Sequence, residues 1–327
     1  MTDKKGATPG RRAEATAGIR LGLCCQFLDA PIRFRSATHR YAGALDAGTR
    51  RSYLATIAAD NAVALRSAVE RCAELGIGAF RITSQILPLG THPDSGYTLE
   101  SLDPAGTIAG QYRAAGAWAR ALGIRLSFHP DQFVVLNSER EAVVASSVGE
   151  LEFQAAVAEL IGVDTLVLHG GGTAGGMGAA LERLERGIDR LSERARSRLT
   201  LENDDRQFAP SDLLPLARRL GVAVVYDVHH HRCRPDGLTV AEASDAAAAT
   251  WRGREPWVHI SSPRDGWESP NPRPHADLID PADFPAEWLG QRVTVDVEAK
   301  AKERAVLALR EALASASTRV AGGSARR

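Results

Sequence analysis

Eight strand-like runs that alternate with helical patterns constrain the fold of this chain more than any other feature of its sequence. The strand-like runs lie at 19–24, 77–83, 124–128, 164–169, 198–202, 222–227, 257–261 and 293–298. The helical patterns lie at 50–75, 105–122, 147–162, 176–195, 210–219, 239–249 and 301–315. This alternation is typical of α/β proteins, and eight repeats predict a (β/α)₈ TIM barrel. A doubly wound open sheet is the alternative, but the Gly-rich first turn typical of that fold does not follow the first strand.

One domain accommodates the whole pattern. A single barrel fits the length of 327 residues, and an apolar fraction of 44% is enough for a sizeable core. We expect the barrel domain at 17–316. The polar, basic segment 1–16 and the similar segment 317–327 are predicted to be a disordered arm and tail.

The bulk composition excludes several classes of protein. Lys plus Arg equals Asp plus Glu at 40 each, so the net charge indicates neither a nucleic-acid nor a membrane partner. A DNA-binding enzyme with this composition would have to build its positive surface locally. The four cysteines show no CxxC spacing, which favours reduced thiols over a zinc ribbon or a disulfide scaffold. No apolar run approaches the ~20 residues needed to cross a bilayer, and no signal peptide is recognisable. We therefore expect a soluble, cytoplasmic protein without a membrane partner.

The stretch 224–231 (VVYDVHHH) carries the strongest chemical signal. It predicts a buried parallel strand that delivers a carboxylate and three imidazoles at its carboxyl end. A buried Asp227 is costly unless it is paired, and a divalent metal would satisfy Asp and His together. His229 and His231 flank His230 and cannot face the same ion, so we expect them to make supporting contacts.

Ionisable side chains stand at the carboxyl ends of strands three to eight, where barrel enzymes carry out their chemistry. They are His129, His169, Glu202, Asp227 with His230, His259 and Glu298, and the loops after strands two and seven add His92 and His275. So many N and O ligands exceed the four that one tetrahedral zinc needs. They suit a cluster of two or three ions that clamps a phosphodiester. The donor types favour Mn²⁺, with Zn²⁺ and Mg²⁺ as alternatives.

The segment 25–49 is long for a strand-to-helix connection, and such loops are often functional. It carries Arg33, Arg35 and Arg40, with aromatic residues between them. This pattern is typical of a surface that stacks bases and binds phosphates. A loop that caps the barrel mouth is an equal alternative.

Six segments of the sequence resemble the UV-damage endonucleases. They are FRITSQILPLGTHP (80–93), LSFHPDQFVVLNS (126–138), LVLHGGG (166–172), LTLENDD (199–205), YDVHHHRCRPDG (226–237) and VEAKAKE (297–303). The resemblance runs from about residue 18 to 305. It implies a single-barrel repair enzyme that nicks duplex DNA on the 5′ side of ultraviolet lesions with a cluster of divalent metals, commonly manganese. The implied partner is damaged double-stranded DNA, bound by a monomer.

The resemblance also implies roles for individual residues. The implied metal shell is His129, His169, Glu202, Asp227, His230, His259, His275 and Glu298. Gln132 and Phe133 are implied to probe the duplex at the lesion, as a wedge that unstacks a base step. The candidate catalytic residues are Glu202, Glu298 and Lys300, although Lys300 could equally form a structural ion pair. The candidate DNA contacts are Gln132, Phe133, Arg33, Arg35, Arg40, His92 and Asn203.

The sequence is compatible with two alternative functions. A xylose-isomerase-like sugar isomerase or epimerase shares the barrel and the metal ligands, but it needs a small closed pocket for proton transfer. The other is a lesion-binding barrel that has lost its chemistry, because Trp257 stands where the family commonly has a lysine. The intact Glu202, Asp227 and Glu298 argue against that loss.

Overall fold

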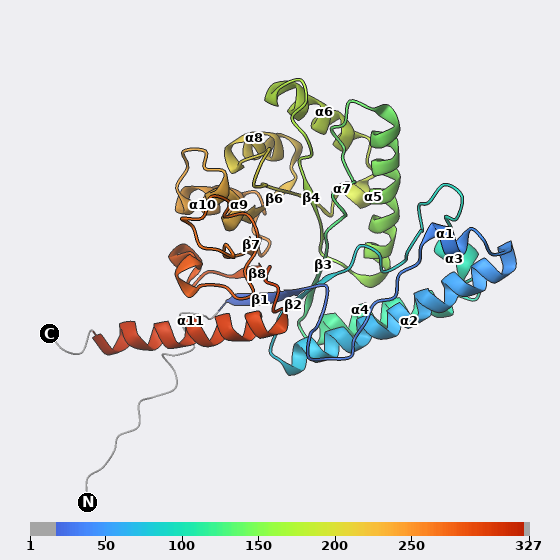
Figure 1. Ribbon diagram of the computed structural model, residues 1–327, viewed down its shortest axis with the longest axis horizontal. Coiled ribbons are helices and arrows are strands. Elements are labelled where there is room, and N and C mark those ends of the chain that lie inside the picture. Colours follow the sequence, from blue (N-terminus) through green and yellow to red (C-terminus); the bar gives the residue numbers. More distant parts are fainter. Residues whose placement is uncertain (1–17, 324–327) are drawn as a thin grey trace, which may run out of the picture.

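Eight parallel strands close into a barrel in the computed structural model, which describes residues 18–323 (Figure 1). The strands are β1 (Ile19–Cys24), β2 (Ala79–Ile82), β3 (Arg125–Phe128), β4 (Thr165–His169), β5 (Leu199–Glu202), β6 (Ala223–Asp227), β7 (Trp257–Ile260) and β8 (Val293–Val297). Each strand pairs with the next, and β1 closes the ring by pairing with β8 from Ile19 beside Val293 to Leu23 beside Val297. The predicted (β/α)₈ barrel is confirmed. The predicted arm at 1–16 and residues 324–327 of the predicted tail lie outside the described residues.

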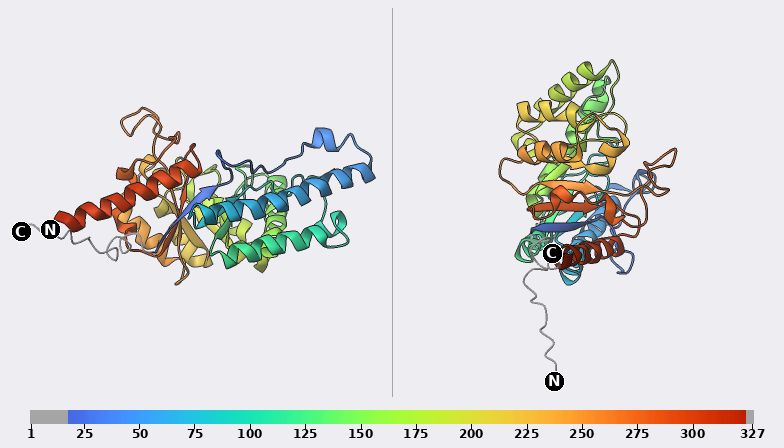
Figure 2. Two further views of the ribbon diagram at one scale, coloured as in Figure 1. Left: turned by 90° about the horizontal axis from the view of Figure 1, so that it is seen from below. Right: turned by 90° about the vertical axis from the view of Figure 1, so that its left-hand side faces the viewer.

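The helices surround the barrel and link successive strands (Figures 1 and 2). They are α1 (His39–Ala42), α2 (Ala47–Glu74), α3 (Leu99–Leu102), α4 (Thr107–Ala121), α5 (Glu141–Ile161), α6 (Met177–Asp189), α7 (Glu193–Arg196), α8 (Pro210–Leu220), α9 (Val228–Cys233), α10 (Val240–Ala249) and α11 (Glu303–Gly323), with two 3₁₀ turns, η2 (Pro281–Asp283) and η3 (Ala286–Trp288). None of the helices in the described part of the chain is both long enough and apolar enough to span a bilayer.

The clearest differences from the sequence prediction lie in the helices. The single helix predicted at 176–195 is two helices, because the hydroxyl of Ser192 accepts the N–H of Ala195 and starts α7 anew. The strand predicted at 222–227 ends at Asp227 as expected, and the histidines that follow it form the short helix α9, whose first turn is capped by the Asp227 carboxylate. Helix α11 continues to Gly323, into the segment predicted as a tail.

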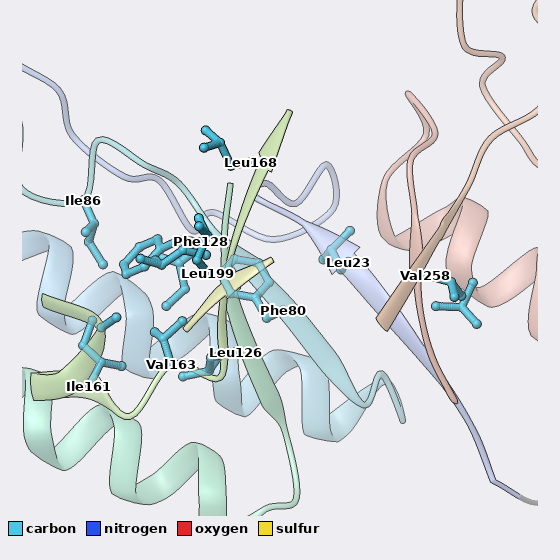
Figure 3. Close-up of a cluster of buried hydrophobic side chains, with 14 of the residues drawn as sticks. Leu23, Phe80, Ile86, Leu126, Phe128, Ile161, Val163, Leu168, Leu199 and Val258 are labelled. Atoms are coloured by element: carbon cyan, nitrogen blue, oxygen red, sulfur yellow. The ribbon is translucent and has the colours of Figure 1, made fainter. Parts of the chain in front are cut away.

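The main core lies between the strands and their covering helices. Figure 3 shows part of it, where outward side chains such as Leu23, Phe80 and Phe128 pack among residues of neighbouring elements. All three are at most 1% exposed. Burying each such side chain stabilises the fold by roughly 1.5–3 kcal/mol. Because the strands are covered on the outside and packed on the inside, their sequences are apolar runs rather than strict alternations.

Inside the barrel a polar floor lies beneath the carboxyl-end layer. The Glu255 carboxylate accepts hydrogen bonds from Arg20 on β1 and from Thr294 on β8, at 3.0 and 2.6 Å. Trp257 on β7 is fully buried, with the Arg125 guanidinium 4.5 Å from its ring centre. Trp257 precedes His259 by two residues and so faces the same side, one layer below it. At this position the tryptophan packs the barrel floor.

A lobe extends from one side of the barrel. Helix α2, about 42 Å long by its residue count, runs beside α4 and projects past the barrel helices (Figures 1 and 2). Helices α1 and α3 lie at its amino-terminal end (Figure 1). The loop from β1 to α1 is tied back by buried Glu303, whose carboxylate accepts the N–H groups of Leu28 and Asp29. The lobe includes α1, which belongs to the long segment 25–49 that the sequence indicated as a possible functional loop.

Candidate metal centre

The eight residues predicted as metal ligands meet at the carboxyl ends of the strands. They are His129, His169, Glu202, Asp227, His230, His259, His275 and Glu298, and a continuous chain of contacts between imidazoles and carboxylates links all eight. They come from β4 to β7, from helix α9 and from the loops after β3, β7 and β8. The carboxyl ends of parallel strands share one face of a barrel, which is why residues so far apart in sequence meet here.

Glu202, fully buried at the end of β5, is the hub of this cluster. Its Oε2 lies 2.8 Å from His129 Nε2, and its Oε1 lies 2.9 Å from His259 Nδ1. His230 and His169 approach the same carboxylate at 3.5 and 3.7 Å. One carboxylate thus faces four imidazoles, which is the arrangement expected of a bridging ligand.

The electrostatics of the cluster reflect opposing effects of burial and neighbouring charge. Burial raises the pKa of Glu202, but His259 and His169 together with the hydrogen bond from His129 hold it well below its ordinary value. Burial lowers the pKa of His230, yet Asp227, Glu202 and Glu298 outweigh it and raise that pKa to about 9. Burial dominates at His169 and lowers its pKa. The site therefore favours the ionised form of Glu202 and the protonated form of His230.

The donor set fits divalent metal ions. Two groups have ligand atoms that all lie within 4.8 Å of one another: His129, His169 and Glu202, and Glu202, Asp227, His259 and Glu298. Buried polar atoms are nearly always hydrogen-bonded, yet Asp227 Oδ2 and His169 Nδ1 have no hydrogen-bond partner. Both atoms belong to residues of these groups. A metal ion would satisfy them.

Supporting contacts orient several of the imidazoles. His129 Nδ1 lies 3.1 Å from the carbonyl of Pro130, and His230 Nδ1 lies 3.0 Å from the carbonyl of Asn203. An N–H donated to a carbonyl leaves Nε2 as the free ligand atom, as is usual for histidines that bind metals. Asn203 is fully buried, and its side chain bonds both backbone groups of Asp227 at 2.8 and 3.0 Å. Its amide braces the loop around the ligands.

Two residues of the cluster were not singled out from the sequence. Arg81, on β2, places its Nη2 2.6 Å from Glu298, 3.0 Å from His259 Nε2 and 3.1 Å from Asp296. Asp296 is fully buried on β8, one layer below Glu298. A charged residue inside an apolar strand is the signal that could have identified both, since an unpaired charge is costly to bury.

The cluster opens onto a cavity of 620 Å³ at the barrel mouth. Gln132 and Phe133, in the turn after β3, line this cavity together with five of the candidate ligands. Phe133 is 79% exposed, an unusual position for a large aromatic ring in this part of the chain. The structure therefore places both residues beside the candidate metal ligands and exposed at the surface.

The other predicted residues occupy different surroundings. Arg33 donates to the carbonyls of its own loop, and Arg35 forms an ion pair with Asp60. Arg40 and Lys300 are exposed, so both are free to meet a substrate.

His92 lies away from the central cluster. It belongs to the loop between β2 and α3, where its ring stacks on that of His39 with 3.9 Å between the ring centres.

The sequence and the fold are both similar to those of known proteins. The sequence model of the family described as UV-endonuclease UvdE matches residues 19–324. The UV DNA damage endonuclease of Deinococcus radiodurans is 37% identical over 311 residues, which cover 89% of this chain and 94% of that protein. A second UV DNA damage endonuclease, from a Nostoc species, is 33% identical, and the match covers 89% of each protein. The crystal structure of SacUVDE superimposes with a TM-score of 0.79 at 25% identity, covering 90% of this chain and 98% of the other.

Proposed function

Because this chain belongs to the UV-endonuclease UvdE family, we propose that it hydrolyses one strand of duplex DNA on the 5′ side of ultraviolet lesions, with divalent metal ions as cofactors. The observation that carries the proposal is the convergence of eight imidazole and carboxylate residues around Glu202 beside an open cavity. An open mouth suits a polymer, whereas a sugar isomerase needs a closed pocket. The isomerase alternative and the inactive-barrel alternative are not favoured by the relatives, which are named as endonucleases.

The proposed cofactor is a cluster of two or three ions, with Mn²⁺ favoured and Zn²⁺ or Mg²⁺ as alternatives. Such ions activate a water molecule and stabilise the attacking and leaving oxygens of the phosphodiester. The protein supplies Glu202 as a bridging carboxylate, with Glu298 and Asp227 as further anionic ligands and the five histidines around them. Because all of these ligands come from one chain, we propose that the protein acts as a monomer.

The rim of the mouth is proposed to select the damaged site. Phe133 and Gln132 project beside the ligands, where a bound backbone must pass. A lesion weakens stacking, so opening the duplex there takes less free energy than opening intact DNA. Arg40 and Lys300 are the proposed phosphate contacts outside the cluster, while Arg33 and Arg35 would act mainly by holding their loop in place.

The substitution Glu202→Gln tests the proposal. It keeps the size of the side chain but removes the bridging charge, so we expect cleavage of irradiated supercoiled plasmid to fall by roughly 10³-fold or more. The matched control is Glu185→Gln, which removes a surface carboxylate paired with Arg219 and should cleave at the wild-type rate. Circular dichroism should report the same fold in both variants. Wild-type cleavage by Glu202→Gln would refute the proposed centre.

The site of the nick and the metal need separate tests. On a duplex with one lesion and a labelled 5′ end, the product should end immediately on the 5′ side of the lesion. Dialysis against a chelator should abolish cleavage, and added Mn²⁺ should restore it. Cleavage that survives complete metal removal would contradict the metal-dependent proposal.

A further inference from the structure

The geometry points to a second metal site, separate from the barrel mouth, in which His39, His92 and Asp94 bind a divalent ion of borderline softness such as Zn²⁺. His39 is the first residue of α1, and the other two residues lie in the loop between β2 and α3. None of the three lines the cavity of the central cluster. The site would therefore connect the start of α1 to a loop that is distant from it in sequence.

The three side chains lie close enough together for one ion to bind all of them once an imidazole ring turns. One ring nitrogen of each histidine and one carboxylate oxygen of Asp94 lie within 4.8 Å of one another. His39 Nε2 is 3.9 Å from Asp94 Oδ2, and the two imidazole rings are stacked with planes 14° apart. Tetrahedral Zn²⁺ with bonds near 2.1 Å holds its ligand atoms about 3.4 Å apart, so the ligand atoms must approach by about 1 Å. An imidazole binds a metal in the plane of its ring, so binding also requires one of the two stacked rings to rotate.

The ligands are oriented by supporting groups, as in established metal sites. His39 Nδ1 lies 2.7 Å from the hydroxyl of Ser95, a side chain only 3% exposed. With Nδ1 bound to Ser95, Nε2 is left free on the side of Asp94. His92 Nδ1 accepts the N–H of Asp94 at 3.2 Å, a long hydrogen bond that a metal on the same nitrogen would replace.

The backbone of the loop is fixed before any ion arrives. The N–H of His92 donates to Leu89, and the carbonyl of His92 accepts the N–H of Gly96 at 2.7 Å. A Cβ on Gly96 would lie 2.6 Å from that carbonyl, so the tight turn requires glycine. A rigid loop lowers the entropic cost of binding because little order must be gained.

The donor chemistry selects the class of ion. Two imidazoles and one carboxylate suit Zn²⁺ and related transition metals, whereas Mg²⁺ and Ca²⁺ prefer sites built from oxygen. Water would complete the coordination, since Asp94 is exposed at the surface. A bound ion would pin the loop from β1, which carries the arginines, to the loop from β2. Thr83 and Gln85, near the start of that second loop, line the mouth itself.

Metal counting tests the inference. We expect full-length protein dialysed against buffered Zn²⁺ to hold one more equivalent, by elemental mass spectrometry, than His39→Ala or Asp94→Ala treated identically. The control is Glu100→Gln, which removes an exposed carboxylate from α3 nearby and should keep the wild-type stoichiometry. Ser95→Ala retains all three ligands but loses the orienting bond, so its affinity for the extra ion should fall by roughly 10–100-fold.

The same variants report on folding, so loss of metal is not confused with loss of structure. Their melting temperatures without metal should stay near wild type, while the rise in melting temperature on adding Zn²⁺ should be smaller than in wild type. Wild-type stoichiometry in folded His39→Ala would overturn the inference. If His39→Ala does not fold, wild-type affinity for every equivalent of Zn²⁺ in Ser95→Ala would overturn it instead.

Discussion

The guanidinium of Arg81 lies 2.6 Å from the Glu298 carboxylate, inside the cluster of candidate metal ligands. It also faces Asp296, so one buried cation pairs with the fully buried Asp296 and the partly buried Glu298. Removing one partner of a buried ion pair costs about 3–5 kcal/mol because the remaining charge is left unpaired. Arg81 thus supplies a permanent positive charge to the site. Any further positive charge beside the carboxylates must come from protonated imidazoles or from bound metal ions.

The substitution Arg81→Met should therefore lower the melting temperature strongly in metal-free protein. Added Mn²⁺ should restore part of the loss, because the ions supply the missing positive charge, so the gain on adding metal should exceed that of wild type. Differential scanning fluorimetry with and without Mn²⁺ measures both. Arg66→Met, which breaks an exposed pair with Glu70, is the control and should change little. Equal metal gains in Arg81→Met and wild type would contradict this account.

Phe133→Ala should reduce the preference for damaged over intact duplex. The ring is 79% exposed, so its removal should change the free energy of unfolding by less than about 0.5 kcal/mol. Competitive cleavage of irradiated and unirradiated plasmids measures the preference, with metal content checked in parallel. A large loss of stability with the preference intact would instead assign Phe133 to packing of its loop.

Two arginines that follow β1 should differ in their roles, because Arg33 supports the fold whereas Arg40 is a proposed DNA contact. Arg33→Ala should destabilise the fold by about 1–2 kcal/mol, because three loop carbonyls lose their donor. Arg40→Ala should leave stability unchanged and weaken binding to any duplex. If Arg40 meets one phosphate, the slope of log K against log salt should fall by about 0.9. Affinities at 50–200 mM salt decide this, and an unchanged slope would exclude Arg40 from the DNA surface.

Glu255, on the barrel floor, should make the stability of the fold decrease as the pH falls into the acid range. Burial would raise its pKa, but hydrogen bonds from Arg20 and Thr294 and the charge of Arg125 lower it from 4.5 to about 2. A depressed carboxyl pKa stabilises the folded state above pH 4.5, and that stability is lost as pH falls from 4.5 towards 2. Glu255→Gln should be less stable by about 2 kcal/mol at neutral pH, with a smaller loss between pH 4.5 and 2 than wild type. Urea unfolding at several pH values measures this, and identical pH profiles would count against the floor network.

Much of the fold and the ligand set could be predicted because both depend on short-range patterns. Apolar runs at regular intervals predict the strands, and side chains such as Glu202 and Asp227 at their ends fall on one face by topology. Arg81 was missed because it stands within a strand, where its pairing with Glu298 and Asp296 is what makes its burial tolerable. The stacked pair of His39 and His92 could not be predicted, since it depends on how two loops cross in space.

The seam between β1 and β8 has a consequence for biosynthesis. A chain is made from its amino terminus, yet β1 has its second neighbour, and the cluster has Glu298, only when the last strand has emerged. A ribosome-bound fragment would hold most of the histidines but neither a closed ring nor the complete carboxylate set. The proposed nuclease would thus be inactive while its chain is being synthesised, and it would become active only after the last strand has joined the barrel.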